Sequence, residues 1–168
     1  MKSTPTPVNF TLLNTHLDDQ SDAQRRLGAS LILTRAKFEA FTTNGPVIVT
    51  GDFNSPATGT DSGAYNISTG ALTPVAVNAT FAQKFAVPDG ALPNFVLTDL
   101  KAVTPTFMVA GDFATFTGFN KPGVTSSFTR IDFVFGGSNG LWYVSIFACC
   151  RHLRRAECSF GLQDCGRV

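Results

Sequence analysis

Residues Pro46–Asn54 read PVIVTGDFN, and this stretch decides the fold. Positions 46–50 are apolar and mostly β-branched, which predicts a buried strand. Gly51 and Asp52 follow directly, and Asn54 lies two residues farther on. Side chains just beyond the carboxyl end of such a strand project into the crevice where open α/β sheets bind their ligands. The stretch therefore predicts an α/β fold with a polar site at the end of this strand.

A strand and a helix are predicted upstream of this stretch. Residues Val8–His16 alternate in polarity and are rich in β-formers, which predicts a strand. Ser21–Gln24 has the form of a capping box, and apolar residues recur at helical spacing as far as Phe41. Asn44–Pro46 then ends the helix. The first fifty residues are therefore expected to form a strand–helix–strand unit with parallel strands.

The rest of the chain is expected to add strands to the same domain. Strands are predicted at Asn94–Leu100, Phe128–Phe135 and Leu141–Ile146, a short helix from Asp61, and a turn at Asn120–Gly123. The chain has 168 residues, 43% of them hydrophobic and 16 of them Phe. This is enough for one domain with an apolar core.

Composition narrows the class of partner. A net charge of +1 gives no general attraction to a phosphate backbone, so binding to nucleic acid is possible but not favoured. No apolar run approaches the length of a membrane span, and Met1–Pro7 lacks the apolar segment of a signal peptide. Sequons at Asn9, Asn66 and Asn78 would permit glycosylation in a secreted protein, so the compartment stays open.

The composition changes near the carboxyl end of the chain. All four cysteines lie there, at positions Cys149, Cys150, Cys158 and Cys165. Their spacing fits neither a paired zinc motif nor a disulfide framework spread over a fold. We expect a domain over residues 8–146 and a Cys/Arg-rich tail over 147–168. That tail is either helical or disordered, or it never belonged to the ancestral fold.

Four residues could hydrolyse a phosphoester if the predicted strand ends meet. Asp52 could orient or deprotonate a water molecule, and Asn54 could donate its amide to a phosphoryl oxygen. His16 could donate a hydrogen bond or a proton to the phosphate. Asp132 lies in an otherwise apolar strand and could orient a second imidazole.

Simpler explanations exist for each of these residues. A Gly-Asp pair after a strand often forms only a turn, and a single histidine such as His16 is more often a satisfied core residue. A charge at Asp132 needs a partner. Arg130 shares its face at a period of two, so the two could form a salt bridge.

Charged residues around the predicted helix start have structural explanations as well. Asp18 and Asp19 are expected to be acids at the helix N-terminus. Arg25 and Arg26 are expected to lie on a solvated helix face; the alternative is that one of them reaches the acidic site.

The combination of motifs is more specific than its parts. Asn14–Asp18 (NTHLD), a helix, Gly51–Asn54 (GDFN) and Arg130–Phe135 (RIDFVF) follow in this order. Over residues 8 to about 141 they resemble the endonuclease/exonuclease/phosphatase superfamily. The stretches LPNF at 92–95, FTGF at 116–119 and GGSNG at 136–140 resemble its fungal branch in particular.

This resemblance implies part of a four-layer α/β sandwich with mixed sheets. It also implies a hydrolase of phosphoester bonds, either a phosphodiesterase or a phosphatase, that depends on Mg²⁺. By the resemblance His16 contacts the phosphate, Asp52 and Asn54 orient the nucleophile and the scissile phosphate, and Asp132 supports the catalytic histidine.

The sequence also departs from the superfamily pattern. Relatives carry a metal-binding Asn and Glu before the segment at Asn14–Asp18 and end in a Ser-Asp-His strand, and neither occurs here. His152, the other histidine, stands between Arg151 and Leu153. The chain is therefore expected to be truncated at both ends, impaired in catalysis and poorly soluble, with its metal ligands unknown. The alternative is a non-catalytic remnant that uses the fold as a binding surface.

Overall fold

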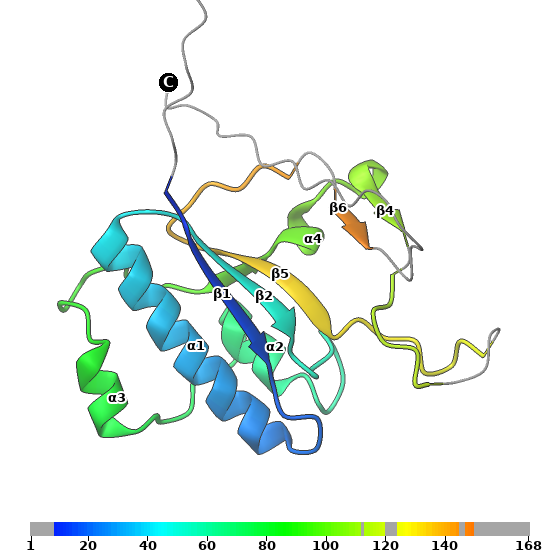
Figure 1. Cartoon of the computed structure of the whole chain (residues 1–168), viewed down its shortest axis with the longest axis horizontal. Coiled ribbons are helices and arrows are strands. Elements are labelled where there is room, and N and C mark those ends of the chain that lie inside the picture. Colours follow the sequence, from blue (N-terminus) through cyan, green and yellow to red (C-terminus); the bar gives the residue numbers. More distant parts are fainter. Residues whose placement is uncertain (1–8, 112, 120–123, 145–146, 150–168) are drawn as a thin grey trace, which may run out of the picture.

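The structure is a computed structural model that describes residues 9–149 except 112, 120–123 and 145–146 (Figure 1). Its centre is a four-stranded sheet in the order β1-β2-β5-β3. The strands are β1 (Thr11–His16), β2 (Val47–Asp52), β3 (Leu97–Asp99) and β5 (Asp132–Gly137). β1 and β2 are parallel, whereas β5 is antiparallel to both β2 and β3. The predicted α/β class with a mixed sheet is confirmed.

Helices and a second, small sheet complete the described elements. The helices are α1 (Asp22–Thr43), α2 (Gly63–Thr69), α3 (Ala79–Lys84), α4 (Leu100–Val103) and the 3₁₀ helix η1 (Thr106–Met108). β4 (Val109–Gly111) pairs in parallel with β6 (Phe147–Cys149). No helix in the described ranges is long and apolar enough to cross a membrane.

α1 has the ends that the sequence predicts. The hydroxyl of Ser21 accepts a hydrogen bond from the backbone N–H of Gln24 at 3.4 Å, as an N-cap does. Asn44 ends the helix in the left-handed conformation with φ 49°, a position where Asn is tolerated better than most residues. The predicted strand–helix–strand unit is confirmed.

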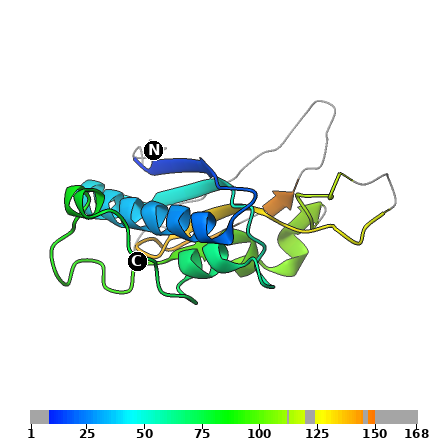
Figure 2. The same cartoon turned by 90° about the horizontal axis from the view of Figure 1, so that it is seen from below.

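The main core lies between the sheet and the helices α1 and α2. Val49 and Phe135 on the sheet are fully buried, as are Ala29 and Ala36 on α1 and Ile67 on α2. The small alanine side chains let α1 lie close to the strands. Figure 2 shows both helices on the same side of β1 and β2.

The opposite face of the sheet is covered at β5 and open at β1. Trp142 packs on β5 so closely that a Cβ at Gly136 would lie 2.2 Å from its ring. Val134 joins the small cluster that also includes residues of β4 and β6. Over β1, by contrast, Leu12 is 55% exposed. The cover on this face therefore extends over only part of the sheet.

Several predicted boundaries were wrong. β5 begins at Asp132 and not at Phe128, because Thr129 forms a bridge with Phe116 instead of joining the sheet. Residues 141–143 are not a strand, and the nearby strand is β6 (Phe147–Cys149). The predicted turn at 120–123 and the cysteines at 150, 158 and 165 lie outside the described residues.

Candidate functional site

Three of the four predicted site residues lie in one row across neighbouring strands. In the sheet register His16 on β1 is opposite Asp52 on β2, and Asp52 is opposite Asp132 on β5. β1 and β2 end at this row, whereas the antiparallel β5 begins there. All three side chains therefore project from the same edge and the same face of the sheet.

His16 and Asp52 form the centre of this row. His16 Nε2 lies 3.6 Å from Asp52 Oδ2, which is longer than a hydrogen bond and becomes an ion pair when the imidazole is protonated. The imidazole is 73% exposed and the carboxylate 26%. The alternative that His16 is a satisfied core histidine is therefore wrong.

Asn54 is fixed against the same carboxylate. Its backbone N–H donates to Asp52 Oδ1 at 2.8 Å, and its Nδ2 donates to the carbonyl of Leu17 at 2.9 Å. The first bond is the turn that the simpler explanation predicts for a Gly-Asp pair. The second ties the end of β2 to the segment after β1. An amide group carries two N–H donors, so one remains for a ligand.

The environment of Asp52 makes its carboxyl group easier to protonate. Burial is the main cause that raises its pKa above the usual 3.8, and the neighbouring charge of Asp132 raises it further. The Asn54 N–H and the nearby His16 act in the opposite direction, and the net shift is upward. A carboxylate with a raised pKa is a better proton acceptor for a water molecule.

Thr115 positions the backbone at Asp132. Its hydroxyl oxygen accepts hydrogen bonds from the N–H of Ile131 at 3.0 Å and from the N–H of Asp132 at 3.1 Å. No sequence motif marks Thr115, so the residue was not among the predicted site residues. Asp132 itself is not among the described residues that line the adjacent pocket.

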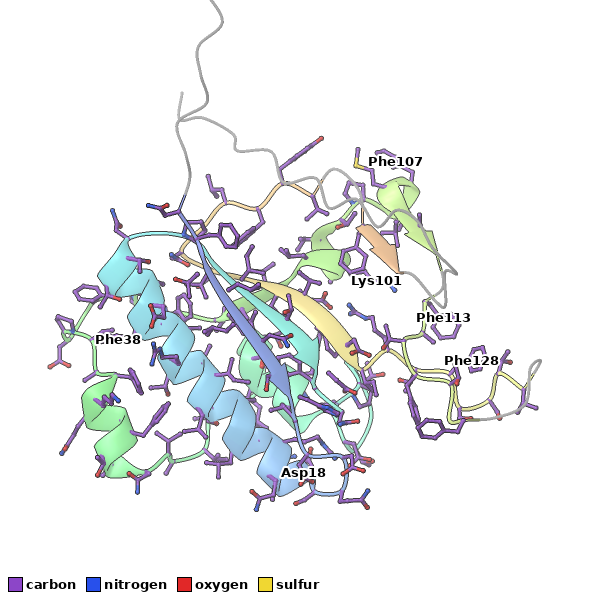
Figure 3. The ribbon with its side chains drawn as sticks, in the orientation of Figure 1. Asp18, Phe38, Lys101, Phe107, Phe113 and Phe128 are labelled. Atoms are coloured by element: carbon purple, nitrogen blue, oxygen red, sulfur yellow. The ribbon has the colours of Figure 1, made fainter. Side chains whose placement is uncertain are left out.

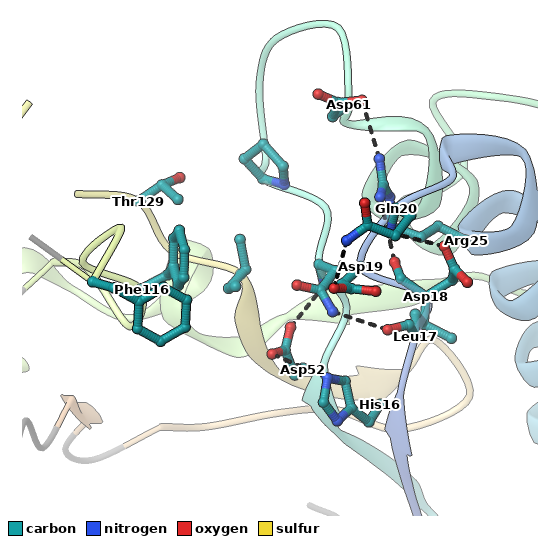
Figure 4. Close-up of a pocket in the computed structure, with 14 residues that line it drawn as sticks. His16, Leu17, Asp18, Asp19, Gln20, Arg25, Asp52, Asp61, Phe116 and Thr129 are labelled. Atoms are coloured by element: carbon teal, nitrogen blue, oxygen red, sulfur yellow. Dashed lines mark hydrogen bonds and ion pairs between the residues drawn. The ribbon is translucent and has the colours of Figure 1, made fainter. Parts of the chain in front are cut away.

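An open pocket of about 1200 Å³ lies beside this row (Figure 4). One part of its wall is acidic and another is apolar and aromatic. The lining residues are His16, Leu17, Asp18, Asp19, Gln20, Arg25, Asp52, Asn54, Pro56, Asp61, Phe116, Phe119, Thr129 and Ile131.

Arg25 lies in the pocket wall and not on a solvated helix face. It is only 4% exposed and donates to Asp61 Oδ1 at 3.0 Å and to the carbonyl of Asp18 at 3.3 Å. The prediction for Arg25 was wrong in its main form, but one of the two arginines does reach the acidic site. Arg26 forms an ion pair with Asp22.

Asp18 does not act within the first turn of the helix. Its Oδ1 accepts the N–H of Gln20 at 2.9 Å and that of Ser21 at 2.6 Å, in the turn that precedes α1. Asp19 accepts a hydrogen bond from the side chain of Gln20 at 2.7 Å. Both acids therefore lie just before the N-cap of α1 and not in its first turn.

Arg130 pairs with Asp99 and not with Asp132. Both terminal nitrogens of its guanidinium donate to the Asp99 carboxylate, which is 2% exposed, and the Tyr65 hydroxyl donates to the same group at 3.1 Å. The guanidinium also lies 4.3 Å from the ring of Phe133. The predicted pair of Arg130 and Asp132 does not form, because the strand begins only at Asp132 and Arg130 lies outside its period of two.

The described residues contain no group of three or more His, Cys, Asp and Glu that could hold a metal ion. Magnesium needs fewer protein ligands than most metals, because it binds through one or two carboxylates together with water and substrate phosphate. Asp52 and Asn54 carry oxygen atoms of the kind that Mg²⁺ prefers, and both line the pocket. The donor set therefore fits a weakly held ion and not a closed metal site.

Comparisons with known proteins give only distant matches. No family model matches the chain, and no curated protein sequence does. Among solved structures, a conserved protein of unknown function from Enterococcus faecalis V583 covers 80% of this chain at 20% identity and a TM-score of 0.49. The chain covers 40% of that protein.

Two further solved structures come from Bacteroides thetaiotaomicron. A mannosyl-6-phosphatase covers 78% of this chain at 24% identity with a TM-score of 0.49, and the chain covers 38% of it. An endonuclease/exonuclease/phosphatase family protein covers 74% at 22% identity with a TM-score of 0.47, and the chain covers 34% of it. The chain thus spans less than half the length of each of these proteins.

Proposed function

We propose that this chain carries part of the active site of a phosphoester hydrolase and that it binds phosphoesters at the Asp52 row with impaired turnover. The single observation that supports this most is the alignment of His16, Asp52 and Asp132 on three adjacent strands. The order of the sequence motifs supports the same proposal. The finer placement in a fungal branch depends on those motifs alone and stays a prediction.

Each residue has a role that follows from its contacts. Asp52 lines the pocket and orients the attacking water. Asn54, fixed by its bond to the Leu17 carbonyl, donates to a phosphoryl oxygen. His16 is exposed beside Asp52 and donates to the phosphate.

The proposed impairment concerns Asp132. A carboxylate in its proposed role orients an imidazole, and within the described ranges His16 is paired with Asp52 instead. His152 lies outside the described residues. Among the described residues no second imidazole is paired with Asp132, and a reaction that lacks it loses general acid–base help, which contributes about 10²–10⁴-fold to such steps.

Magnesium is part of this proposal. Asp52 and Asn54 would hold the ion together with the phosphate, and the ion would offset negative charge on the phosphoryl oxygens. The acidic lining makes this necessary, because Asp18, Asp19 and Asp61 surround the same pocket. A phosphate would otherwise be repelled by these carboxylates.

Binding and turnover are tested separately. Inorganic phosphate is titrated with and without Mg²⁺ and followed by calorimetry, and turnover is measured with bis-p-nitrophenyl phosphate. We expect Mg²⁺-dependent binding that weakens about tenfold or more in Asp52→Ala, since a charge-assisted contact is lost. Asp89→Ala, an exposed carboxylate outside the pocket, is expected to bind as the wild type does.

The two results discriminate between the hypotheses. Binding with little turnover supports the proposal. Fast Mg²⁺-dependent turnover that is lost in Asp52→Ala would contradict the proposed impairment and would still support a phosphoester hydrolase. Absence of phosphate binding with Mg²⁺ present would contradict the phosphoester site and favour the non-catalytic remnant.

A further inference from the structure

Two phenylalanines form an apolar wall across the pocket from the acidic residues. Phe116 and Phe119 meet edge to face, with ring centroids 5.4 Å apart at 88°. Phe119 is 95% exposed although it lines the pocket. Figure 4 shows Phe116 on one side of the pocket and Asp52 and Arg25 on the other. The two ends of the pocket therefore offer different chemistry.

The backbone holds this wall in place. The N–H of Phe116 donates to the carbonyl of Thr129 at 2.9 Å, and the N–H of Thr129 donates back at 3.0 Å. The backbone N–H of the preceding Thr115 also donates to the Thr129 carbonyl at 3.0 Å. The Thr115 hydroxyl oxygen accepts a hydrogen bond from the N–H of Asp132. The segment that carries the rings is thus connected to the site row.

Phe119 differs from other exposed aromatic residues because it lines the pocket. A single aromatic side chain on the surface is common, but Phe119 is exposed into a pocket whose opposite wall holds the proposed phosphate site. A phosphoryl group fills only a small part of about 1200 Å³. The remaining space borders the apolar residues Phe116, Phe119, Pro56 and Ile131.

We propose that the pocket selects phosphoesters whose alcohol part carries a planar ring. The ring packs on Phe119 and Phe116, and the phosphate lies at the Asp52 end. Aromatic side chains give this kind of contact to any flat π-system. The inference rests on the proposed function for the position of the phosphate.

Charge restricts the ligand to one with few phosphates. Four aspartates of the described part of the chain line the pocket, at positions 18, 19, 52 and 61. Arg25, the one arginine among the described lining residues, already binds Asp61 and the Asp18 carbonyl. A chain of phosphates would be repelled by these carboxylates at several points, whereas a phosphoester with a single phosphate is repelled at only one. A small ring-bearing phosphoester therefore fits better than a long polyanion.

The test compares non-hydrolysable ligands that lack either the ring or the phosphonate group. Phenylphosphonate, ethylphosphonate and the uncharged benzyl alcohol are titrated in the presence of Mg²⁺ and followed by NMR. The variants are Phe119→Ala and Phe116→Leu. Phe107→Ala is the matched control, because Phe107 is 82% exposed and lies far from the pocket residue Asp18 (Figure 3).

The wild type is expected to bind phenylphosphonate about fivefold or more tighter than ethylphosphonate, the lower end of what stacking on an aromatic side chain contributes. Phe119→Ala should reduce this ratio toward one, Phe116→Leu should lower it partly, and Phe107→Ala should preserve it. The ethylphosphonate affinity should stay the same in all four proteins.

Failures of the two proposals look different. If the wild type binds both phosphonates equally, the proposed ring subsite is overturned and the proposed phosphate site still stands. Binding of benzyl alcohol as tight as that of phenylphosphonate, with no ethylphosphonate binding, would overturn the phosphate site. A ring preference that survives in Phe119→Ala and Phe116→Leu would also overturn the inference, because the ring would then bind elsewhere.

Discussion

Gly51 allows β1 and β2 to approach each other beside the site row. Its φ is 135°, and a Cβ built there would lie 1.9 Å from the carbonyl oxygen of Thr15, the residue opposite it in the sheet. Only glycine has both the backbone freedom and the small size for this position. The presence of glycine before Asp52 in the sequence motif is thus explained by the lack of space for a side chain.

Replacing Gly51 tests this reason directly. We expect Gly51→Ala to lower the free energy of unfolding by about 3 kcal/mol or more, because backbone strain and a clash with backbone atoms add. Gly59→Ala is the matched control, since Gly59 also has a positive φ of 102° but has no atom within 4 Å of its Cβ position. It should cost only about 1 kcal/mol. Equal losses in urea denaturation would contradict the clash.

The raised pKa of Asp52 has a consequence for stability. Its carboxyl group is protonated more easily in the folded chain than in the unfolded chain, mainly because it is buried. The folded state therefore binds more protons, and stability falls as pH rises above the usual value of 3.8 and through the folded pKa. Above the folded pKa this cost is complete.

Asp52→Asn removes the titrating group and should remove this cost. The variant is expected to gain stability relative to the wild type as pH rises from about 3 to 7, with the largest difference on the neutral side. Thermal unfolding at several pH values measures it, with Asp89→Asn as an exposed control. A difference that is constant or that shrinks with rising pH would show that burial does not raise the pKa.

At the scale of elements, α1 and β2 follow local rules, and β5 does not. The caps of α1 and the apolar run of β2 depend on residues that are neighbours in the sequence. The boundaries of both elements were therefore predicted to within a few positions. The start of β5 is set by Thr115, whose hydroxyl accepts the N–H groups of Ile131 and Asp132. Those N–H groups are thus satisfied at the strand start by a side chain sixteen and seventeen residues away.

Thr115→Val tests this anchor because it keeps the side-chain shape and removes the acceptor. We expect a loss of about 1–3 kcal/mol, since two backbone N–H groups lose their partner. Amide hydrogen exchange should increase at Ile131 and Asp132 and stay unchanged in α1. Thr125→Val, at an exposed position of the same connection, is the control. Unchanged protection at both amides in Thr115→Val would mean that the hydroxyl does not anchor the strand.

For the molecule as a whole, the uncovered face of β1 is the main feature. Phe10 is 56% exposed and Leu12 55% exposed on the face opposite the helices. Among the described strands, β1 also lies at the edge of the main sheet. Apolar side chains beside an open strand edge favour association between molecules.

Neighbouring leucines on β1 give a matched pair of variants. Leu12→Gln should change the free energy of unfolding by less than about 0.5 kcal/mol and reduce self-association, because Leu12 faces out. Leu13→Gln should cost about 2 kcal/mol, because Leu13 packs against the core. Denaturation and concentration-dependent light scattering measure both effects. A large loss of stability in Leu12→Gln would mean that this face is covered.

The sequence by itself determined the strand–helix–strand unit and the residues at its strand ends. Periodicity, caps and turn residues act between near neighbours, so they can be read along the chain. His16, Asp52, Asn54 and Asp132 were identified as candidates by residue type and position.

Only the tertiary structure decided which of these side chains meet and what surrounds them. The partner of Arg130 is 31 residues away, the Asp61 partner of Arg25 is 36 residues away, and Thr115 reaches Asp132 over 17. Such pairs depend on sheet register and helix packing, which bring distant segments together. No local pattern encodes this register, and it is the register that places His16, Asp52 and Asp132 in one row beside a pocket.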